Sequence, residues 1–111
     1  MSSKKGSQSN YASGIRAENK VKNAYKSAGF SVTQSAGSRG AADLKCTRDS
    51  TTHYVQVKST SNASSTPYIS NAEVGRLKST ATRNGATSVI AKVTPNNMNV
   101  QYAKTGNNVK F

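Results

Sequence analysis

The sequence has little from which a disulfide-bonded or zinc-stabilised domain could be built. Cys46 is its one cysteine and His53 its one histidine, which excludes an intrachain disulfide and the usual His/Cys zinc sites. Tryptophan is absent and only 33% of residues are hydrophobic, so any core must be compact. No apolar run approaches the roughly 20 residues that span a bilayer, and no apolar stretch follows the first lysines as in a secretory signal. These absences predict one small intracellular domain.

Acidic residues are also scarce, and their scarcity makes the chain strongly basic. Sixteen Lys and Arg residues face four Asp and Glu residues, giving a formal net charge of +12. Such a charge attracts polyanions, and nucleic acid is the expected partner because phosphate contacts dominate its binding. An anionic membrane surface is the competing partner, but no segment shows a wide apolar face opposite a basic one.

The chain divides into a short polar start and one domain. Residues 1–12 are mostly Ser, Lys, Gly, Gln and Asn, and we expect a mobile basic arm there, followed by a single domain over 13–111. Ser13 can cap a first helix that Gly29 ends, and Ser70 with Glu73 forms a capping box for a second helix. We expect helices at 13–28 and 70–84, a Gly/Ser loop at 35–41, and strands at 30–34, 42–47, 53–58, 87–94 and 98–104.

This element order, α-β-β-β-α-β-β, predicts an α/β fold in which helices flank a mixed β-sheet. Two of the four acids have evident structural roles within it. Glu73 completes the capping box, and Asp49 lies in the turn between two strands. Glu18 and Asp43 have no such role, because Glu18 lies at the edge of the core-facing stripe of the first helix and Asp43 lies inside a strand.

The two unexplained acids are expected to meet a glutamine and a lysine. Asp43 and Gln56 lie on adjacent antiparallel strands, Lys58 shares the face of Gln56, and a helix packed on that sheet can bring Glu18 to the same point. Two carboxylates and an amide oxygen suit Mg²⁺, and a lysine beside them can orient or deprotonate water or stabilise phosphate charge. His53 faces away on its strand and is expected to pack. Phosphodiester cleavage requires such a set of groups.

These residues carry a resemblance to a known family. Asp43 followed by Gln56-Val57-Lys58 resembles the D…(E/Q)xK core of the PD-(D/E)xK nuclease superfamily, which has a restriction-endonuclease-like fold. Over roughly residues 4 to 95 the sequence is similar to archaeal-type Holliday-junction resolvases. The matching segments, in order, are KKG near the start, Glu18, AGF at 28–30, SAGSRGAADL at 35–44, VQVKST at 55–60 and YIS at 68–70.

The resemblance implies roles for individual residues. It assigns metal binding to Glu18, Asp43 and Gln56, catalysis to Lys58, and a further requirement for Ser38 in the glycine-rich loop. It implies Mg²⁺ as cofactor, with Mn²⁺ able to substitute, and a homodimer whose two-fold symmetry suits a four-way junction. The sequence departs from the family pattern at Ala42, which replaces a proline, and at Gln56, where the resolvases usually have glutamate.

The expected function is a Mg²⁺-dependent, structure-selective DNA endonuclease that resolves four-way junctions inside a cell, in an archaeon, a bacterium or a virus-infected host. One alternative is another nuclease of the same fold, of a nicking, repair or restriction (Mrr-like) type. The other is a catalytically inactive junction-binding module. Basic residues expected to contact DNA are Lys4, Lys5, Arg16, Lys20, Arg39, Lys45 and Arg48.

Overall fold

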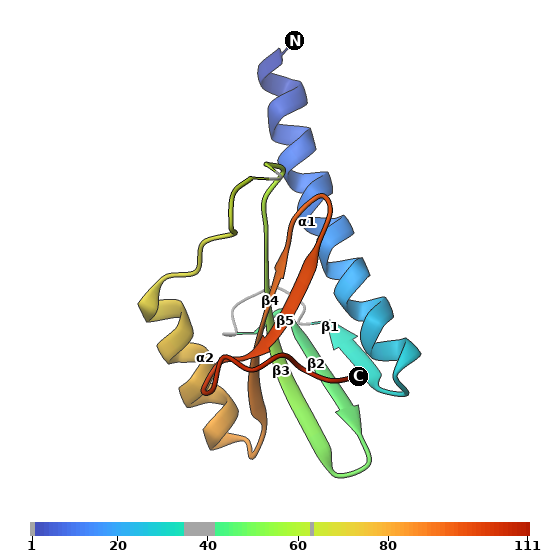
Figure 1. The fold of residues 1–111 in the computed structure, drawn as a ribbon, viewed down its shortest axis with the longest axis vertical. Helices are drawn as coiled ribbons and strands as arrows, with labels where there is room; N and C mark the ends of the chain where they lie inside the picture. The colour runs from blue at the N-terminus through green and yellow to red at the C-terminus, as the bar shows by residue number, and fades with distance from the viewer. Residues whose placement is uncertain (1, 35–41, 63) are drawn as a thin grey trace.

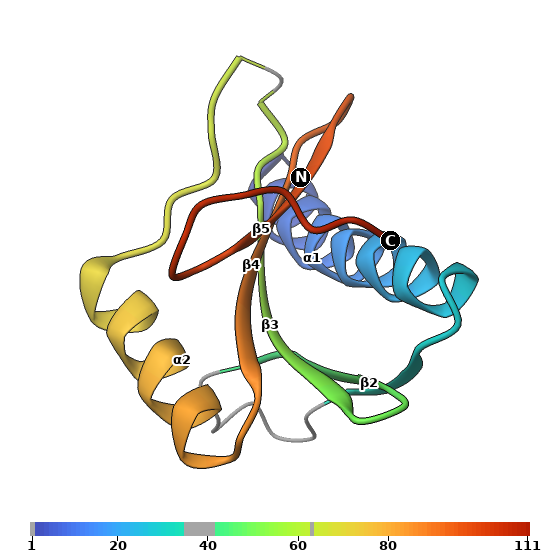
Figure 2. The same ribbon diagram turned by 60° about the horizontal axis from the view of Figure 1, so that its bottom comes forward.

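A five-stranded sheet lies between two helices, in the strand order β1-β2-β3-β4-β5 (Figure 1). The computed structural model describes residues 2–34, 42–62 and 64–111, with side chains from residue 15 onward. Figure 2 shows α1 and α2 on opposite sides of β3 and β4. The predicted fold class and element order are confirmed. The elements are α1 (Ser2–Ser27), β1 (Ser31–Gln34), β2 (Leu44–Arg48), β3 (Thr51–Ser59), α2 (Asn71–Arg83), β4 (Thr87–Val93) and β5 (Met98–Tyr102).

The sheet is mixed because one of its four strand pairs is parallel. β1 with β2, β2 with β3, and β4 with β5 are antiparallel, whereas β3 and β4 are parallel and are connected through α2. Gly29, with a φ of 92°, ends α1, and Asp49, with a φ of 55°, lies in the turn between β2 and β3. The turn role predicted for Asp49 is therefore confirmed.

The main core lies between α1 and the sheet. Val21 and Tyr25 on α1 are fully buried, as the predicted apolar stripe requires, whereas Ile15 at its margin is 44% exposed. Their partners on the sheet include Leu44, Cys46, Val55, Val89 and Ala91.

His53 belongs to this core. It is only 5% exposed, and its Nδ1 forms a hydrogen bond of 2.9 Å with the Tyr25 hydroxyl. The prediction that it packs agrees with this position. Its side chain leaves β3 on the α1 face, so Gln56 and Lys58 leave the strand on the face of α2.

The first helix differs from the prediction at its start. α1 begins at Ser2, so the expected start at Ser13 is wrong. Residues 2–12 contain no proline, and Ser13 continues the helical backbone into this segment without capping it. The side chains of Lys4 and Lys5 lie outside the described ones, and the mobility of residues 1–12 stays a prediction. Within the described part of the chain, no helix has the length and apolar character needed to cross a membrane.

Candidate active site

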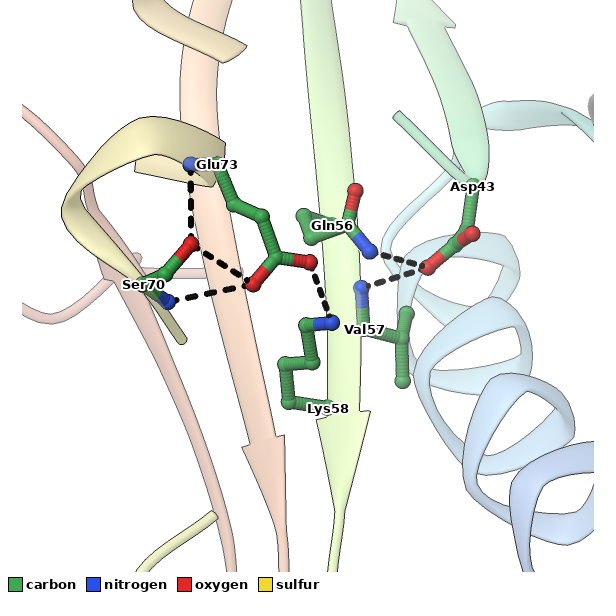
Figure 3. A network of polar contacts seen from close by, with 6 residues as sticks. All are labelled: Asp43, Gln56, Val57, Lys58, Ser70 and Glu73. Atoms are coloured by element: carbon green, nitrogen blue, oxygen red, sulfur yellow. Dashed lines mark hydrogen bonds and ion pairs between the residues drawn. The ribbon is translucent and has the colours of Figure 1, made fainter. Parts of the chain in front are cut away.

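The register of β2 and β3 sets Asp43 beside Gln56. Leu44 pairs with Val55, and the Asp43 amide extends the ladder by donating to the Val55 carbonyl at 2.8 Å. Oδ2 of Asp43 then accepts two hydrogen bonds from β3, from the Val57 amide at 2.9 Å and from Nε2 of Gln56 at 3.1 Å (Figure 3). The predicted neighbours therefore touch, and the carboxylate is held by the strand backbone.

Lys58, the next residue on this face of β3, is bonded to helix α2. Its Nζ lies 2.6 Å from Oε2 of Glu73. Oε1 of Glu73 accepts from the amide and the hydroxyl of Ser70, both at 3.1 Å, so the predicted capping box is confirmed. Sequence reasoning assigned Glu73 to this cap alone and missed its contact with Lys58. One signal was available in the sequence: a capping box uses only one oxygen of the glutamate, which leaves the second oxygen free to bond another residue.

Glu18 approaches the site from α1. It is half-buried, and its Oε1 accepts a hydrogen bond of 3.2 Å from Nε2 of Gln34 at the end of β1. Burial raises the pKa of Glu18, the negative charge of Asp43 raises it further, and the bond from Gln34 lowers it. Glu18 therefore lies within electrostatic reach of Asp43. Among the described contacts, it has no direct bond to Asp43, Gln56 or Lys58.

The two acids beside Lys58 have opposite electrostatic environments. Burial raises the pKa of Asp43, an effect that the Val57 amide and Lys58 reduce and that the charge of Glu73 increases. The pKa of Glu73 is lowered to about 2, first by the hydrogen bond from Lys58 and then by Ser70. The lowered pKa keeps Glu73 ionised at neutral pH. Burial disfavours the ionised form of Asp43, and a bound cation would stabilise that form.

The donor set fits a hard divalent cation. Carboxylate oxygens are the ligands such a cation prefers, Glu18 lies within electrostatic reach of Asp43, and Oδ1 of Asp43 is used by none of the described hydrogen bonds. No group of three or more His, Cys, Asp or Glu side chains suited to a metal gathers among the described residues. The third donor is the amide of Gln56, which now turns its Nε2 toward Asp43 and would offer Oε1 after rotating. The set carries less negative charge than three carboxylates.

Two of the predicted DNA contacts line a cavity at the C-terminal ends of β3 and β4. Arg16 and Lys20 are exposed on α1, and they face residues 59–61 and 93–95 across a cavity of about 290 Å³. These residues follow or end the parallel strands β3 and β4. Two cations and several hydroxyl groups around one hollow suit a phosphate.

The other predicted contacts are less uniform. Lys45 is exposed on β2 and shares the face of Asp43. Arg48 donates to the Ala28 carbonyl at 2.6 Å, and its guanidinium carbon lies 4.4 Å from the Phe30 ring centroid. This cation–π contact gives Arg48 a structural role, and its DNA contact stays a prediction. Ser38 and Arg39 lie outside the described residues.

Comparison with known proteins identifies the family. The family model for the archaeal Holliday junction resolvase (Hjc) matches residues 9–107. The chain belongs to this family. The Hjc family consists of metal-dependent endonucleases that are typically dependent on Mg²⁺, and membership implies binding of Holliday-junction DNA. The resemblance expected from the sequence is confirmed.

A solved Hjc structure has the same fold. The Hjc of Archaeoglobus fulgidus, described as a Holliday junction resolvase from an archaeal hyperthermophile, superimposes with a TM-score of 0.72 at 22% identity, covering 87% of this chain and 78% of its own. A search of curated protein sequences found no match. Position 56 of this chain carries a neutral amide, and Glu73 is the acid bonded to Lys58, two residues further along the strand.

Proposed function

We propose that this protein hydrolyses phosphodiester bonds of four-way DNA junctions as a Mg²⁺-dependent homodimer. The observation that carries the proposal is the contact between Asp43 and Gln56, two positions before Lys58 on one face of β3. Glu18 supports it, because the charge of Asp43 acts on its pKa. Membership of the Hjc family supports the junction as substrate.

Each group has a distinct chemical task in this proposal. Glu18, Asp43 and Gln56 would hold Mg²⁺, or Mn²⁺ in its place, a cation that lowers the pKa of bound water and offsets phosphate charge. Asp43 keeps its orientation because the Val57 amide bonds its Oδ2 at 2.9 Å. Lys58 places a positive charge where negative charge develops on the scissile phosphate. Ser38 is proposed as a further requirement for cleavage.

The basic side chains would hold the DNA. Arg16 and Lys20 line one cavity, which supports a phosphate contact beyond the scissile bond. A two-fold symmetric dimer would present two such sites to the two strands cut at a junction. With DNA as substrate, the protein would act inside a cell. The remaining proposed phosphate contacts are Lys4, Lys5, Arg39, Lys45 and Arg48.

A cleavage assay tests the proposal directly. Wild type and Asp43→Ala are incubated with Mg²⁺ or Mn²⁺ and with a synthetic four-way junction, a linear duplex or a flapped duplex. We expect wild type to cut the junction in preference to the other substrates and Asp43→Ala to be inactive. Preferential cleavage of a linear or flapped duplex would identify another nuclease of the same fold.

A second candidate function is junction binding without cleavage. The hydrogen bond from Nε2 of Gln56 to Asp43 favours it, because this bond occupies Oδ2 of the carboxylate without a metal and points an amide nitrogen, which cannot bind a cation, at the site. Under this alternative, wild type and Asp43→Ala bind the junction equally well and are equally inert with both metals. That result would exclude the nuclease.

A further inference from the structure

The carboxylate of Glu73 connects the start of helix α2 to the lysine of the site. Oε1 accepts the two bonds of the capping box, and Oε2 accepts from Nζ of Lys58 at 2.6 Å. Figure 3 shows Glu73 between Ser70 on one side and Lys58 on the other. The cap fixes the carboxylate by two hydrogen bonds to Ser70, so its free oxygen is a fixed acceptor for the ammonium group.

Lys58 needs such an acceptor because a second lysine lies next to it. Lys58 and Lys92 are register partners in the parallel pair of β3 and β4, so both side chains leave the sheet on the same face. Like charges on directly opposed residues repel. Oδ2 of Asp43 is already occupied by Gln56 and Val57. In the described part of the chain, Glu73 is the side chain that bonds Lys58.

The amide at position 56 makes this contact more consequential. A glutamate there would place a carboxylate on the face of Lys58, two residues away on the same strand. Gln56 carries no charge, and its Nε2 is directed at Asp43. The negative charge next to the ammonium group comes instead from another element, the first turn of α2.

We propose that Glu73 is a positioning residue that holds the Lys58 ammonium group at the Asp43–Gln56 site, and so supplies the charge beside the lysine that position 56 lacks. This inference rests on the proposed nuclease function. Glu73 acts through Lys58 and needs no contact with the DNA. The capping role and the contact with Lys58 can be tested separately, because Oε1 forms the capping box and Oε2 bonds Lys58.

The test compares Glu73→Gln with Ser70→Ala. Glutamine at this position still completes a capping box but removes the anion that bonds Lys58. Ser70→Ala weakens the cap by removing the hydroxyl, and the amide of residue 70 still donates to Oε1 and keeps the Glu73 carboxylate in place. Single-turnover cleavage of a four-way junction with Mg²⁺, junction affinity without metal, and Tm are measured for each variant.

We expect Glu73→Gln to cleave about tenfold or more slowly, because misplacing a catalytic group by an ångström costs up to about a hundredfold. Its junction affinity should stay within about twofold and its Tm near that of wild type. Ser70→Ala should show the reverse, a lower Tm with cleavage within a few-fold of wild type. Equal cleavage by Glu73→Gln and wild type would overturn the proposal. Equal slowing in the two variants would also do so, because the cap would then be the cause.

A second measurement is independent of cleavage. An amine-reactive ester labels the protein briefly, and mass spectrometry gives the extent of Lys58 modification relative to Lys104, an exposed lysine that follows β5. Loss of the bond to Glu73 should raise this ratio several-fold in Glu73→Gln and leave it unchanged in Ser70→Ala. An unchanged ratio in Glu73→Gln refutes the positioning role. A wild type that cuts no DNA refutes the proposed function alone, and the labelling ratio still decides the role of Glu73.

Discussion

The glutamine at position 56 can be replaced by the acid that the resolvases usually carry, and the structure predicts a metal-dependent result. In Gln56→Glu, an oxygen replaces the Nε2 that donates to Oδ2 of Asp43 at 3.1 Å. A hydrogen bond to a charged group becomes a repulsion between two carboxylates. Without metal the variant should be less stable than wild type, and with metal it should bind the cation more tightly.

The size of the effect follows from this contact. A hydrogen bond to a charged group contributes about 1.5–3 kcal/mol. Two unit charges held at 3.1 Å repel by about 5 kcal/mol at an effective dielectric constant near 20, although the half-exposed side chain at 56 can turn away and relieve most of this. A net loss of about 2 kcal/mol corresponds to a Tm about 9 °C lower for 111 residues, at about 2.1 cal/mol/K of unfolding entropy per residue.

Thermal unfolding at slightly alkaline pH, where both carboxyl groups ionise, measures the effect with and without Mg²⁺. A cation at a hundred times its Kd adds about 2.7 kcal/mol, so saturating Mg²⁺ should close most of the gap to wild type. Cleavage of a four-way junction should equal or exceed that of wild type. Gln101→Glu is the matched control, because Gln101 on β5 donates to the neutral amide of Asn108. If the metal-free stability of Gln56→Glu equals that of wild type and Mg²⁺ adds nothing further, no metal binds between positions 43 and 56.

The remaining predictions concern the lysine, the cavity and the buried histidine. Lys58→Ala should lower cleavage by about 10²–10⁴-fold and leave junction affinity within a few-fold; a loss of affinity instead would make Lys58 a phosphate contact. Arg16→Ala and Lys20→Ala should each reduce the slope of log affinity against log salt concentration by about 0.9, as measured by junction titrations. An unchanged slope would show that the cavity they line does not bind a DNA phosphate. Burial lowers the pKa of His53, with a smaller contribution from Arg48. The unfolded chain therefore takes up this proton first, and Tm should fall as pH drops below about 6.5. His53→Gln should flatten this part of the Tm–pH curve, and an unaltered curve would assign the effect to other groups.

The order of elements could be predicted because local signals mark most of the boundaries. Gly29 ends the first helix with a positive φ, and Ser70 with Glu73 begins the second. The start of α1 was missed because the prediction relied on such a local signal. Ser13 is a good cap by residue type, and nothing local indicates that the helix continues through it. Cap residues show where a helix can begin, and the preceding segment decides whether it does.

The contact of Asp43 with Gln56 could also be predicted, because a short turn fixes the register of an antiparallel pair. Glu18 was expected to reach the same point from its position on the helix; the structure brings it within electrostatic reach of Asp43 and bonds it to Gln34 at the end of β1. The position of Glu18 relative to Gln34 and Asp43 depends on how α1 crosses the sheet. Sequence periodicity gives the face of a helix that packs but not the crossing angle.

Glu73 was missed because a complete local explanation concealed a long-range one. Its role in the capping box is correct, but that role uses only Oε1. Because β3 and β4 are parallel, the chain must return from the end of β3 to the start of β4, and α2 makes this connection. The first turn of α2 therefore lies near the C-terminal part of β3. Lys58 is the second-last residue of β3, and Glu73 is the third residue of α2. Once β3 and β4 are known to be parallel, an acid in the first helical turn becomes the expected partner of a lysine near the end of the first strand. The fold therefore supplies, from α2, a carboxylate that the QVK segment of β3 does not contain.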